Sequence, residues 1–416
     1  MKWDIKSRLN ELHRTGELQT GRQLAETLKA PAEDRLFPGE GREEETAFGR
    51  CYMRELRFSL DHRHGSSRLE GILNCSGPQI ALPARDAGLE SFEPQRSVFL
   101  DIETTGLSGG TGTWAFLIGL GWLEENHFLL RQYFLRRPAE ERSILSHFAA
   151  EADKYPTMIT FNGKMFDLPL IQTRQMLAGF RQTVPEKHLD LLQCARVLWK
   201  KRLESRSLRS IEESLLGLHR YDDIPGAEIP AVYFDYLRRG KTARLKQVFH
   251  HNVLDILSMV TLLERIACLG AGQNVEHPAE ALALGRLCLR AGRVAEGISY
   301  LSDAAAGNVD LLATEAALEL SFYYKRLGQW AEAVEIWLAL ADSRKPNPTA
   351  LIELAKYYEH RVKDFGKALE LTLETLSVVN QKPYCFTNGE ACIEALKHRH
   401  ARLLRKISGT EKPQPS

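Results

Sequence analysis

Two acidic residues stand two positions apart at the end of an apolar segment, a spacing that can bring two carboxylates together. Asp101 and Glu103 follow the run SVFL, and this pattern predicts a strand. Side chains at positions i and i+2 of a strand point to the same face. Two like charges in a partly buried place are costly unless a cation neutralises them, and Mg²⁺ and Mn²⁺ prefer oxygen ligands. The pair therefore suggests a divalent-metal site, although two solvated acids at a strand end would show the same spacing.

Further acids occur where neighbouring elements are expected to meet. Asp167 closes the segment FNGKMFD, which follows the short apolar run MIT at an expected junction of strand and helix. Asp255 lies among Val253, Leu254 and Ile256 in a long apolar-periodic segment, which is a poor place for a surface acid. Four acids in this order fit a site for phosphoryl transfer in which two metal ions stand about 3.5 to 4 Å apart.

The segments that carry these acids resemble the motifs of a known family. FLDIETTGL, FNGKMFD and HHNVLD are similar to the three motifs of the DEDD, or DnaQ-like, 3′–5′ exonucleases, which have the ribonuclease H-like fold. The extension GLSGGTGTWAFLIGLG resembles a YprB-like bacterial subgroup, whose members often carry tetratricopeptide repeats. The resemblance covers residues 97–268. It implies that Asp101, Glu103, Asp167 and Asp255 bind two divalent cations, Mg²⁺ or Mn²⁺, and that the substrate is a single-stranded 3′ end of DNA or RNA.

The resemblance also implies a general base, for which two adjacent histidines are candidates. Family members have either a His five residues before the last Asp or a Tyr four residues before it, and His250 and His251 occupy these two positions. A residue four positions before Asp255 lies on the same face of a helix, which favours His251, as does the subgroup pattern HNxxD. A histidine with a pKa near the ordinary value of about 6.5 suits the removal of a proton from a metal-bound water.

Residues that flank the acids are candidates for contact with the nucleotide. Thr104 and Gly106 follow the first acidic pair and open a glycine-rich loop whose backbone amides could lie near a substrate phosphate. Asn162 could position the second motif or contact a nucleotide, and a plain turn residue is the alternative. Asp190 lies between the second and third motifs, either as a second-shell or substrate-side acid or as an acid that caps a helix or ends a strand.

Basic residues are concentrated in two segments between the second and third motifs. Residues 196–209 hold six basic residues and one acid, and residues 236–246 hold five basic residues and no acid. We expect Arg238, Arg239 and Lys241 to contact backbone phosphates, whereas the alternative is a pair of solvated helix faces.

The glycine-rich segment also matches a different catalytic motif. Residues 106–110 read GLSGG, which fits the GxSxG nucleophile elbow of serine esterases. The elbow requires a helix directly after the serine, but TGTWAFLIGLG has the composition of a strand. No GK[ST] follows, so the segment is not a P-loop either. Both alternatives are therefore disfavoured.

The elements expected around the motifs form an α/β domain over residues 93–268. Three successive segments, SVFLDIETT, TWAFLIGLGWL and HFLLRQYFLRR, predict antiparallel strands, and alternating helices and strands follow. A long helix from Leu245 to Leu269 closes the domain, so the expected fold is a mixed sheet with flanking helices. Residues 1–92 form a region of unknown role, with a helix between Ile5 and Leu28, a charged loop, and short strands between Glu55 and Pro83.

The chain from residue 270 to 405 changes to an alanine-, leucine- and glutamate-rich composition that repeats. RAGRVAEGISYL, RLGQWAEAVEIW and RVKDFGKALELT align at intervals of 36 and 35 residues. This period predicts tetratricopeptide-like helical pairs, whose concave face could bind a protein or only pack against the first domain. An irregular bundle is the alternative, and residues 406–416 are expected to form a flexible tail.

Composition limits the class of protein. The 416 residues are 44% hydrophobic and 26% charged, which excludes a wholly disordered chain or a disulfide scaffold. The net charge of +1 argues against tight nonspecific coating of long nucleic acid. We expect a cytoplasmic protein with no membrane partner, because no apolar run approaches roughly 18 residues and the N-terminus lacks a signal-peptide core. The seven cysteines include no CxxC pair, which predicts reduced thiols.

These features favour a metal-dependent 3′–5′ exonuclease that hydrolyses phosphodiester bonds. The alternative is a non-catalytic scaffold that binds nucleic acid or protein on the same fold. The presence of all four acids favours the enzyme.

Overall fold

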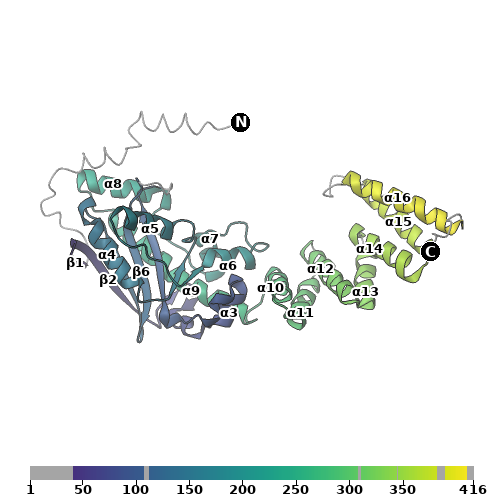
Figure 1. Ribbon diagram of the computed structural model, residues 1–416, viewed down its shortest axis with the longest axis horizontal. Coiled ribbons are helices and arrows are strands. Elements are labelled where there is room, and N and C mark those ends of the chain that lie inside the picture. Colours follow the sequence, from purple (N-terminus) through teal and green to yellow (C-terminus); the bar gives the residue numbers. More distant parts are fainter. Residues whose placement is uncertain (1–40, 107–111, 308–310, 344, 382–388, 410–416) are drawn as a thin grey trace, which may run out of the picture. The chain divides into compact units, whose positions relative to one another are not determined.

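The computed structural model describes residues 41–106, 112–307, 311–343, 345–381 and 389–409. It divides the chain into two units, Met1–Val275 and Glu276–Ser416 (Figure 1). The expected helix between Ile5 and Leu28, and most of the glycine-rich loop after Gly106, lie outside the described residues.

A mixed seven-stranded sheet forms the centre of the first unit. In spatial order the strands are β1 (Gly41–Thr46), β2 (Gly49–Ser59), β7 (His127–Phe134), β6 (Ala115–Glu124), β5 (Ser97–Thr104), β8 (Thr157–Thr160) and β9 (Lys187–Asp190). The expected meander is confirmed, because β5 pairs antiparallel with β6, and β6 with β7. β8 and β9 continue from β5 in parallel. A separate two-stranded sheet pairs β3 (Arg63–His64) with β4 (Ser67–Arg68).

The sheet begins upstream of the expected domain boundary at residue 93. β2 pairs with β7 from Tyr52 opposite Phe134 to Ser59 opposite His127, and β1 pairs with β2. Residues 41–59 therefore belong to this domain. The sequence GREEET of β1 is charged and contains no buried residue, because β1 lies at an edge of the sheet, and it therefore lacks the pattern of a buried strand.

Helices cover both faces of the sheet. On β7, Gln132 donates to the carbonyl oxygen of Phe249 in α9 (Leu245–Gly270) over 2.8 Å. The neighbouring Arg131 points to the other face and pairs with Glu151 of α4 (Glu141–Ala152) at 2.8 Å. The other helices of this unit are α3 (Gly77–Ala84), α5 (Asp167–Leu177), α6 (Leu191–Leu198), α7 (Leu208–Ile211) and α8 (Ile229–Arg239). Short 3₁₀ segments lie at Leu69–Asn74, Ala87–Ser91, Pro94–Arg96, Pro138–Glu140 and Gly226–Glu228, and a π-helical turn lies at Glu212–Leu216.

Helix α9 lies close to the sheet because β6 carries glycines beneath it. A Cβ added to Gly119 would stand 2.3 Å from the side-chain oxygen of Asn252 and 2.7 Å from Cδ1 of Ile256. A Cβ on Gly121 would stand 2.8 Å from the same isoleucine. These two positions therefore set the depth at which α9 packs.

The second unit is helical throughout its described residues. Its α-helices are α10 (Pro278–Arg290), α11 (Val294–Ala305), α12 (Leu311–Leu327), α13 (Trp330–Ala341), α14 (Pro348–Tyr357), α15 (Phe365–Gln381) and α16 (Gly389–Ile407), and a π-helical segment, Tyr358–Val362, follows α14. Each helix packs against the next along the chain. The fold class is thus confirmed as a mixed sheet with flanking helices followed by an all-helical region. Helix α16 continues to Ile407, so residues 406 and 407 of the expected tail are helical, and residues 410–416 lie outside the described residues.

The aligned stretches of the second unit occupy equivalent places in its helices. Helices α11, α13 and α15 begin at Val294, Trp330 and Phe365, which are the residues aligned in the sequence. Two positions before each start, the backbone has a positive φ: 78° at Gly292, 77° at Gly328 and 65° at Lys363. The same left-handed turn therefore precedes each helix, once without the glycine that favours it. Assignment of these pairs as tetratricopeptide repeats stays a prediction.

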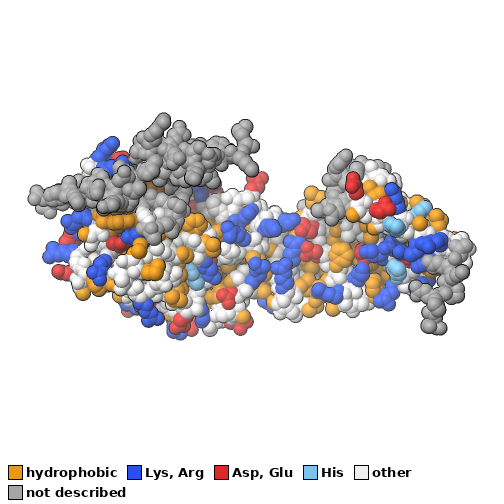
Figure 2. Space-filling view, turned by 45° about the horizontal axis from the view of Figure 1, so that its top comes forward, with side chains coloured by type: hydrophobic (Ala, Val, Ile, Leu, Met, Phe, Trp, Pro, Cys, Tyr) orange, Lys and Arg blue, Asp and Glu red, His pale blue; other side chains and the backbone are white. Residues whose placement is uncertain are grey.

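The described surface carries charges of both signs. Figure 2 shows lysine and arginine side chains in small groups, interspersed with acidic, apolar and uncharged side chains. No helix among the described residues combines the length and apolar character needed to cross a bilayer. The cysteines of the described segments, all except Cys385, are free thiols.

The close approach of α9 can be tested by Gly119→Ala. The added methyl group would overlap Asn252, so we expect a loss of about 1 to 3 kcal/mol in the free energy of unfolding, measured by urea denaturation. Gly226→Ala is the matched control, because nothing lies within 4 Å of its added Cβ. Equal stability of the two variants would contradict the packing described for α9.

Candidate active site

Four carboxylates from three segments gather on the face of the sheet covered by α9. Asp101 and Glu103 lie on β5, Asp167 is the first residue of α5, and Asp255 lies on α9. All four are partly buried, and the negative charges of Asp255, Glu103 and Asp167 each act on Asp101. The tertiary structure thus brings together the acids that the sequence separates by up to 154 positions, from residue 101 to residue 255.

Burial and mutual repulsion raise the pKa values of three of these carboxyl groups. The pKa of Asp101 lies well above its ordinary value, first because of burial and then because of Asp255, Glu103 and Asp167. Burial raises the pKa of Glu103 to about 8, although the positive charge of His251 opposes the shift. Burial likewise raises the pKa of Asp167 to about 7. The surrounding protein therefore does not fully compensate the negative charge that these groups carry once they are ionised.

A buried amide fixes the orientation of Asp101. Asn252 of α9 is fully buried, and its Nδ2 donates to Oδ2 of Asp101 at 2.7 Å and to the Asp101 carbonyl oxygen at 3.2 Å. Its Oδ1 accepts from Nε2 of Gln132 at 2.8 Å. The amide therefore connects β7, α9 and β5 at the first acidic pair. Asn252 was not among the predicted site residues, although it is the asparagine of the HNxxD pattern that favoured His251.

His251, and not His250, faces the carboxylates. Its Nδ1 lies 2.8 Å from Oδ2 of Asp223, and its Nε2 lies 3.6 Å from Oδ2 of Asp255. His250 is exposed and lines a separate pocket on another face of α9. Successive residues of a helix point about 100° apart, so only one of two adjacent histidines can share the face of Asp255. Of the two histidines that were candidates for the base, the structure therefore places His251, and not His250, beside Asp255.

The pKa of His251 also differs from the expected value near 6.5. Burial lowers it, but the hydrogen bond with Asp223 and the charges of Asp255 and Glu103 outweigh burial and raise the pKa to about 9. Without bound cations, His251 is therefore charged at neutral pH.

Arg220 forms ion pairs with three acidic residues beside His251. Its guanidinium is 4% exposed and donates to Oε2 of Glu212 at 2.7 Å, to Oδ2 of Asp223 at 3.1 Å and to Oδ1 of Asp255 at 2.5 Å. Two members of this network, Arg220 and Asp223, lie in the loop HRYDD and were not among the predicted site residues. One arginine with two aspartates in a segment between two helices was the only available signal.

Asp190 holds the backbone of the second motif in place through hydrogen bonds. It is 2% exposed, and its carboxylate accepts from the backbone N–H groups of Asn162 at 2.8 Å, Lys164 at 3.3 Å and Leu192 at 3.1 Å. It therefore caps α6 and holds the turn that leads to Asp167, and Asn162 adopts a positive φ of 68° in that turn. Asp190 thus caps a helix and also supports the second motif through its backbone.

A cavity of about 510 Å³ opens beside the acids. Its lining includes Asp101 and Asp255, together with Phe161, Asn162, Leu192, Arg196, Arg206, Ser207 and Leu208. Two arginines of the first basic segment thus reach the cavity. The described lining of the cavity does not include Arg238, Arg239 or Lys241. These three residues are exposed at and after the end of α8.

The residues after the first acidic pair close a turn. Oγ1 of Thr104 donates to the carbonyl oxygen of Gly106 at 2.9 Å, and neither residue lines the cavity in the described part of the chain. The esterase alternative is contradicted at its structural requirement, because strand β6, and not a helix, follows the glycine-rich loop.

Among the described residues, no group of three or more His, Cys, Asp or Glu side chains is arranged to hold a metal ion. The four carboxylates are close enough to raise one another's pKa, and Arg220 holds one oxygen of Asp255. The donor chemistry is nevertheless that of a Mg²⁺ or Mn²⁺ site, because all four side chains offer carboxylate oxygens.

Comparison with known proteins finds similarity to one family model, one curated relative and one solved structure. The model of the RNase_H superfamily matches residues 98–267. "Uncharacterized protein YprB" of Bacillus subtilis (strain 168) is 34% identical over 370 residues, which cover 86% of this chain and 86% of that protein. A solved family B DNA polymerase from the hyperthermophilic archaeon Pyrobaculum calidifontis is similar with a TM-score of 0.34 and 14% identity, over 50% of this chain and 29% of the polymerase.

The raised pKa of Glu103 predicts a pH-dependent effect of Glu103→Gln on stability. The folded chain keeps this proton up to about pH 8, whereas the unfolded chain loses it near the ordinary value of 4.5. The carboxyl group therefore destabilises the metal-free fold increasingly as pH rises between these values. In EDTA, we expect the Tm of the variant to exceed that of the unmodified chain by a margin that grows from pH 5 to pH 8.

Glu186→Gln is the control for this measurement, because Glu186 is exposed and distant in sequence from the four acids. Its Tm difference from the unmodified chain should stay constant over the same range. A constant difference for Glu103→Gln as well would contradict the electrostatic description of the site.

Proposed function

The chain belongs to the RNase H superfamily, in the same family as YprB of Bacillus subtilis, and from this premise we propose that it is a metal-dependent nuclease. The proposed reaction removes nucleotides from the 3′ end of single-stranded DNA or RNA by hydrolysis of the phosphodiester bond. The observation that supports it is the gathering of four carboxylates beside a cavity that also contains two arginines.

Asp101, Glu103, Asp167 and Asp255 would hold two divalent cations, Mg²⁺ or Mn²⁺. The raised pKa values of the first three are what uncompensated carboxylates show before a cation neutralises them. When bound, such ions activate the attacking water and stabilise the leaving oxygen. Asn252 keeps Asp101 oriented for this purpose through its 2.7 Å hydrogen bond.

His251 is the proposed general base, with Asp223 as a positioning residue. Because Nδ1 faces the Asp223 carboxylate at 2.8 Å, this nitrogen carries a proton and Nε2 is left to exchange one. Nε2 is also the atom on the side of Asp255, at 3.6 Å. Cations on Asp255 and Glu103 would offset the negative charge that raises the pKa of His251 to about 9, and would thereby favour its basic form.

Arg196 and Arg206 are the proposed contacts for the phosphates of the strand end. Both line the cavity that contains Asp101 and Asp255. Arg206 donates to the carbonyl oxygens of Leu203 at 3.0 Å and Glu204 at 2.8 Å, which holds its side chain in place. Arg196 is exposed, and the described residues offer it no ion pair. Asn162 lines the same cavity and is the proposed contact for the terminal nucleotide.

The activity is tested with 5′-labelled single-stranded DNA and RNA in the presence of Mn²⁺. We expect stepwise shortening from the 3′ end, and a loss of about 100-fold or more in Asp101→Ala, since even outer partners of metal sites cost about 10- to 100-fold. Asp222→Asn, at an exposed neighbouring loop position, should keep the activity. Absence of shortening of either substrate would favour the non-catalytic scaffold, and shortening that survives Asp101→Ala would point to a contaminant.

The role of Asp223 is tested by Asp223→Asn. Loss of its charge should lower the pKa of His251 in an NMR titration of the metal-free chain and reduce kcat by about 10- to 100-fold. The limb of the pH–rate profile that reports the base should shift in the same direction as the NMR value. Asp222→Asn should change neither quantity. A reduced kcat with an unchanged pKa of His251 would indicate a merely structural role for Asp223.

A further inference from the structure

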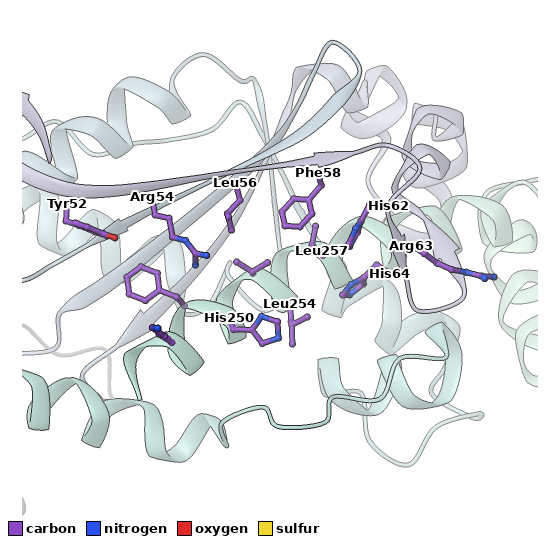
Figure 3. Close-up of a pocket in the computed structure, with 13 residues that line it drawn as sticks. Tyr52, Arg54, Leu56, Phe58, His62, Arg63, His64, His250, Leu254 and Leu257 are labelled. Atoms are coloured by element: carbon purple, nitrogen blue, oxygen red, sulfur yellow. The ribbon is translucent and has the colours of Figure 1, made fainter. Parts of the chain in front are cut away.

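A second pocket lies on the other side of α9 from the acids. It has a volume of about 670 Å³ and lies between β2 and α9, near the strands β3 and β4 (Figure 3). Its lining residues are Tyr52, Arg54, Leu56, Phe58, His62, Arg63, His64, Lys246, Phe249, His250, Val253, Leu254 and Leu257. This β2–α9 pocket contains no acidic side chain in its described lining. Its volume falls in the range of small-molecule sites, which is about 300 to 1,000 Å³.

The pocket is built by regular elements. Alternate residues of β2, from Tyr52 to Phe58, point towards α9, as Figure 3 shows for the four labelled side chains. On α9 the lining positions recur at helical spacing from Lys246 to Leu257, whereas His251 and Asp255 lie on another stripe. The pocket is therefore rigidly framed, and α9 separates it from the four carboxylates.

One end of the pocket is positively charged without compensation. Nε of Arg54 is buried and has no hydrogen-bond partner in the described residues. The described chain also gives Arg54 and Lys246 no carboxylate partner, unlike Arg131 and Arg220 of the same domain, which are paired. Because a buried guanidinium nitrogen without a partner is costly, an anionic ligand would stabilise this end of the pocket.

The other end of the pocket is apolar and aromatic. Phe58 packs against His62 with ring centroids 5.0 Å apart, and Leu254 and Leu257 lie beneath them on α9 (Figure 3). His64 adds no charge here, because burial lowers its pKa to about 3 and its Nε2 lies 2.8 Å from the Ser258 hydroxyl. Arg63 points away from the centre of the pocket.

We propose that the β2–α9 pocket binds a small phosphorylated ligand of nucleotide size. Its phosphates would contact Arg54 and Lys246, and a planar apolar group such as a nucleobase would pack at the Phe58 end. A nucleic-acid strand fits less well, because Arg54 and Lys246 are followed by an apolar surface and the third cation of the lining, Arg63, points away from the centre of the pocket. The inference is independent of the proposed nuclease activity, since none of the lining residues belongs to the proposed catalytic set.

Binding is tested by calorimetry on the full chain in EDTA, with ADP and inorganic pyrophosphate as probes. We expect saturable binding of ADP, and a loss of affinity of about tenfold or more in Arg54→Gln and in Lys246→Gln. Lys246 is exposed, so we expect Lys246→Gln to leave the fold stable. This variant therefore tests the proposal even if Arg54→Gln lowers the stability of the fold. ADP should bind more tightly than pyrophosphate, and Phe58→Leu should reduce that difference.

Arg57→Gln is the matched control, because Arg57 lies on the same strand but outside the pocket lining and pairs with Glu55 at 3.3 Å. This variant should bind ADP as the unmodified chain does. No ADP binding, or binding unchanged by both Arg54→Gln and Lys246→Gln, would overturn the proposal. The proposal would also be overturned if Arg54→Gln and Lys246→Gln weakened the binding of a single-stranded oligonucleotide but not that of ADP. In that case the pocket would be part of the path that a nucleic-acid strand follows.

Discussion

The crowding of negative charge beside β5 is the constraint on which the surrounding structure depends. Asp101, Glu103, Asp167 and Asp255 repel one another in a partly buried place, and the raised pKa values of the first three express the energetic cost. The neighbouring side chains offset this cost without removing it. Arg220 supplies a buried positive charge to Asp255, the Asn252 amide donates to Asp101, and His251 carries a proton between two acids.

Helix α9 is the element that makes this arrangement possible. Glycines on β6 let it approach the sheet, so that Asn252 reaches the backbone and side chain of Asp101. Two faces of α9 have different surroundings. His251 and Asp255 lie on the face beside Asp101 and Glu103, whereas Lys246 and His250 line the β2–α9 pocket. A rigid helix of this kind places two sites of opposite charge on the two sides of one element.

Much of the first domain could be predicted from local patterns. The strands over residues 97–134 and the long helix that begins at Leu245 have strong apolar periodicity, and the first and third acidic motifs lie within them, whereas the second motif follows β8. The edge strand β1 was missed, because its exposed, charged sequence lacks the signal of a buried strand. Arg220 and Asp223 were missed for a related reason, since a loop has no periodicity that marks a buried ion pair.

The sequence by itself determined which acids are present, their attachment to strand ends and helices, and the helical period of the second unit. The spacing along the helix already favoured His251 over His250, because a residue four positions before Asp255 lies on the same helical face. Only the tertiary structure decided that this face of α9 turns towards the acids and Asp223, because this depends on the rotation of α9 about its axis against the sheet. It also decided that Asp190 accepts backbone N–H groups and that Arg196 and Arg206 reach the cavity in place of Arg238 and Arg239. These roles depend on contacts between distant segments, and no local pattern of residues encodes such contacts.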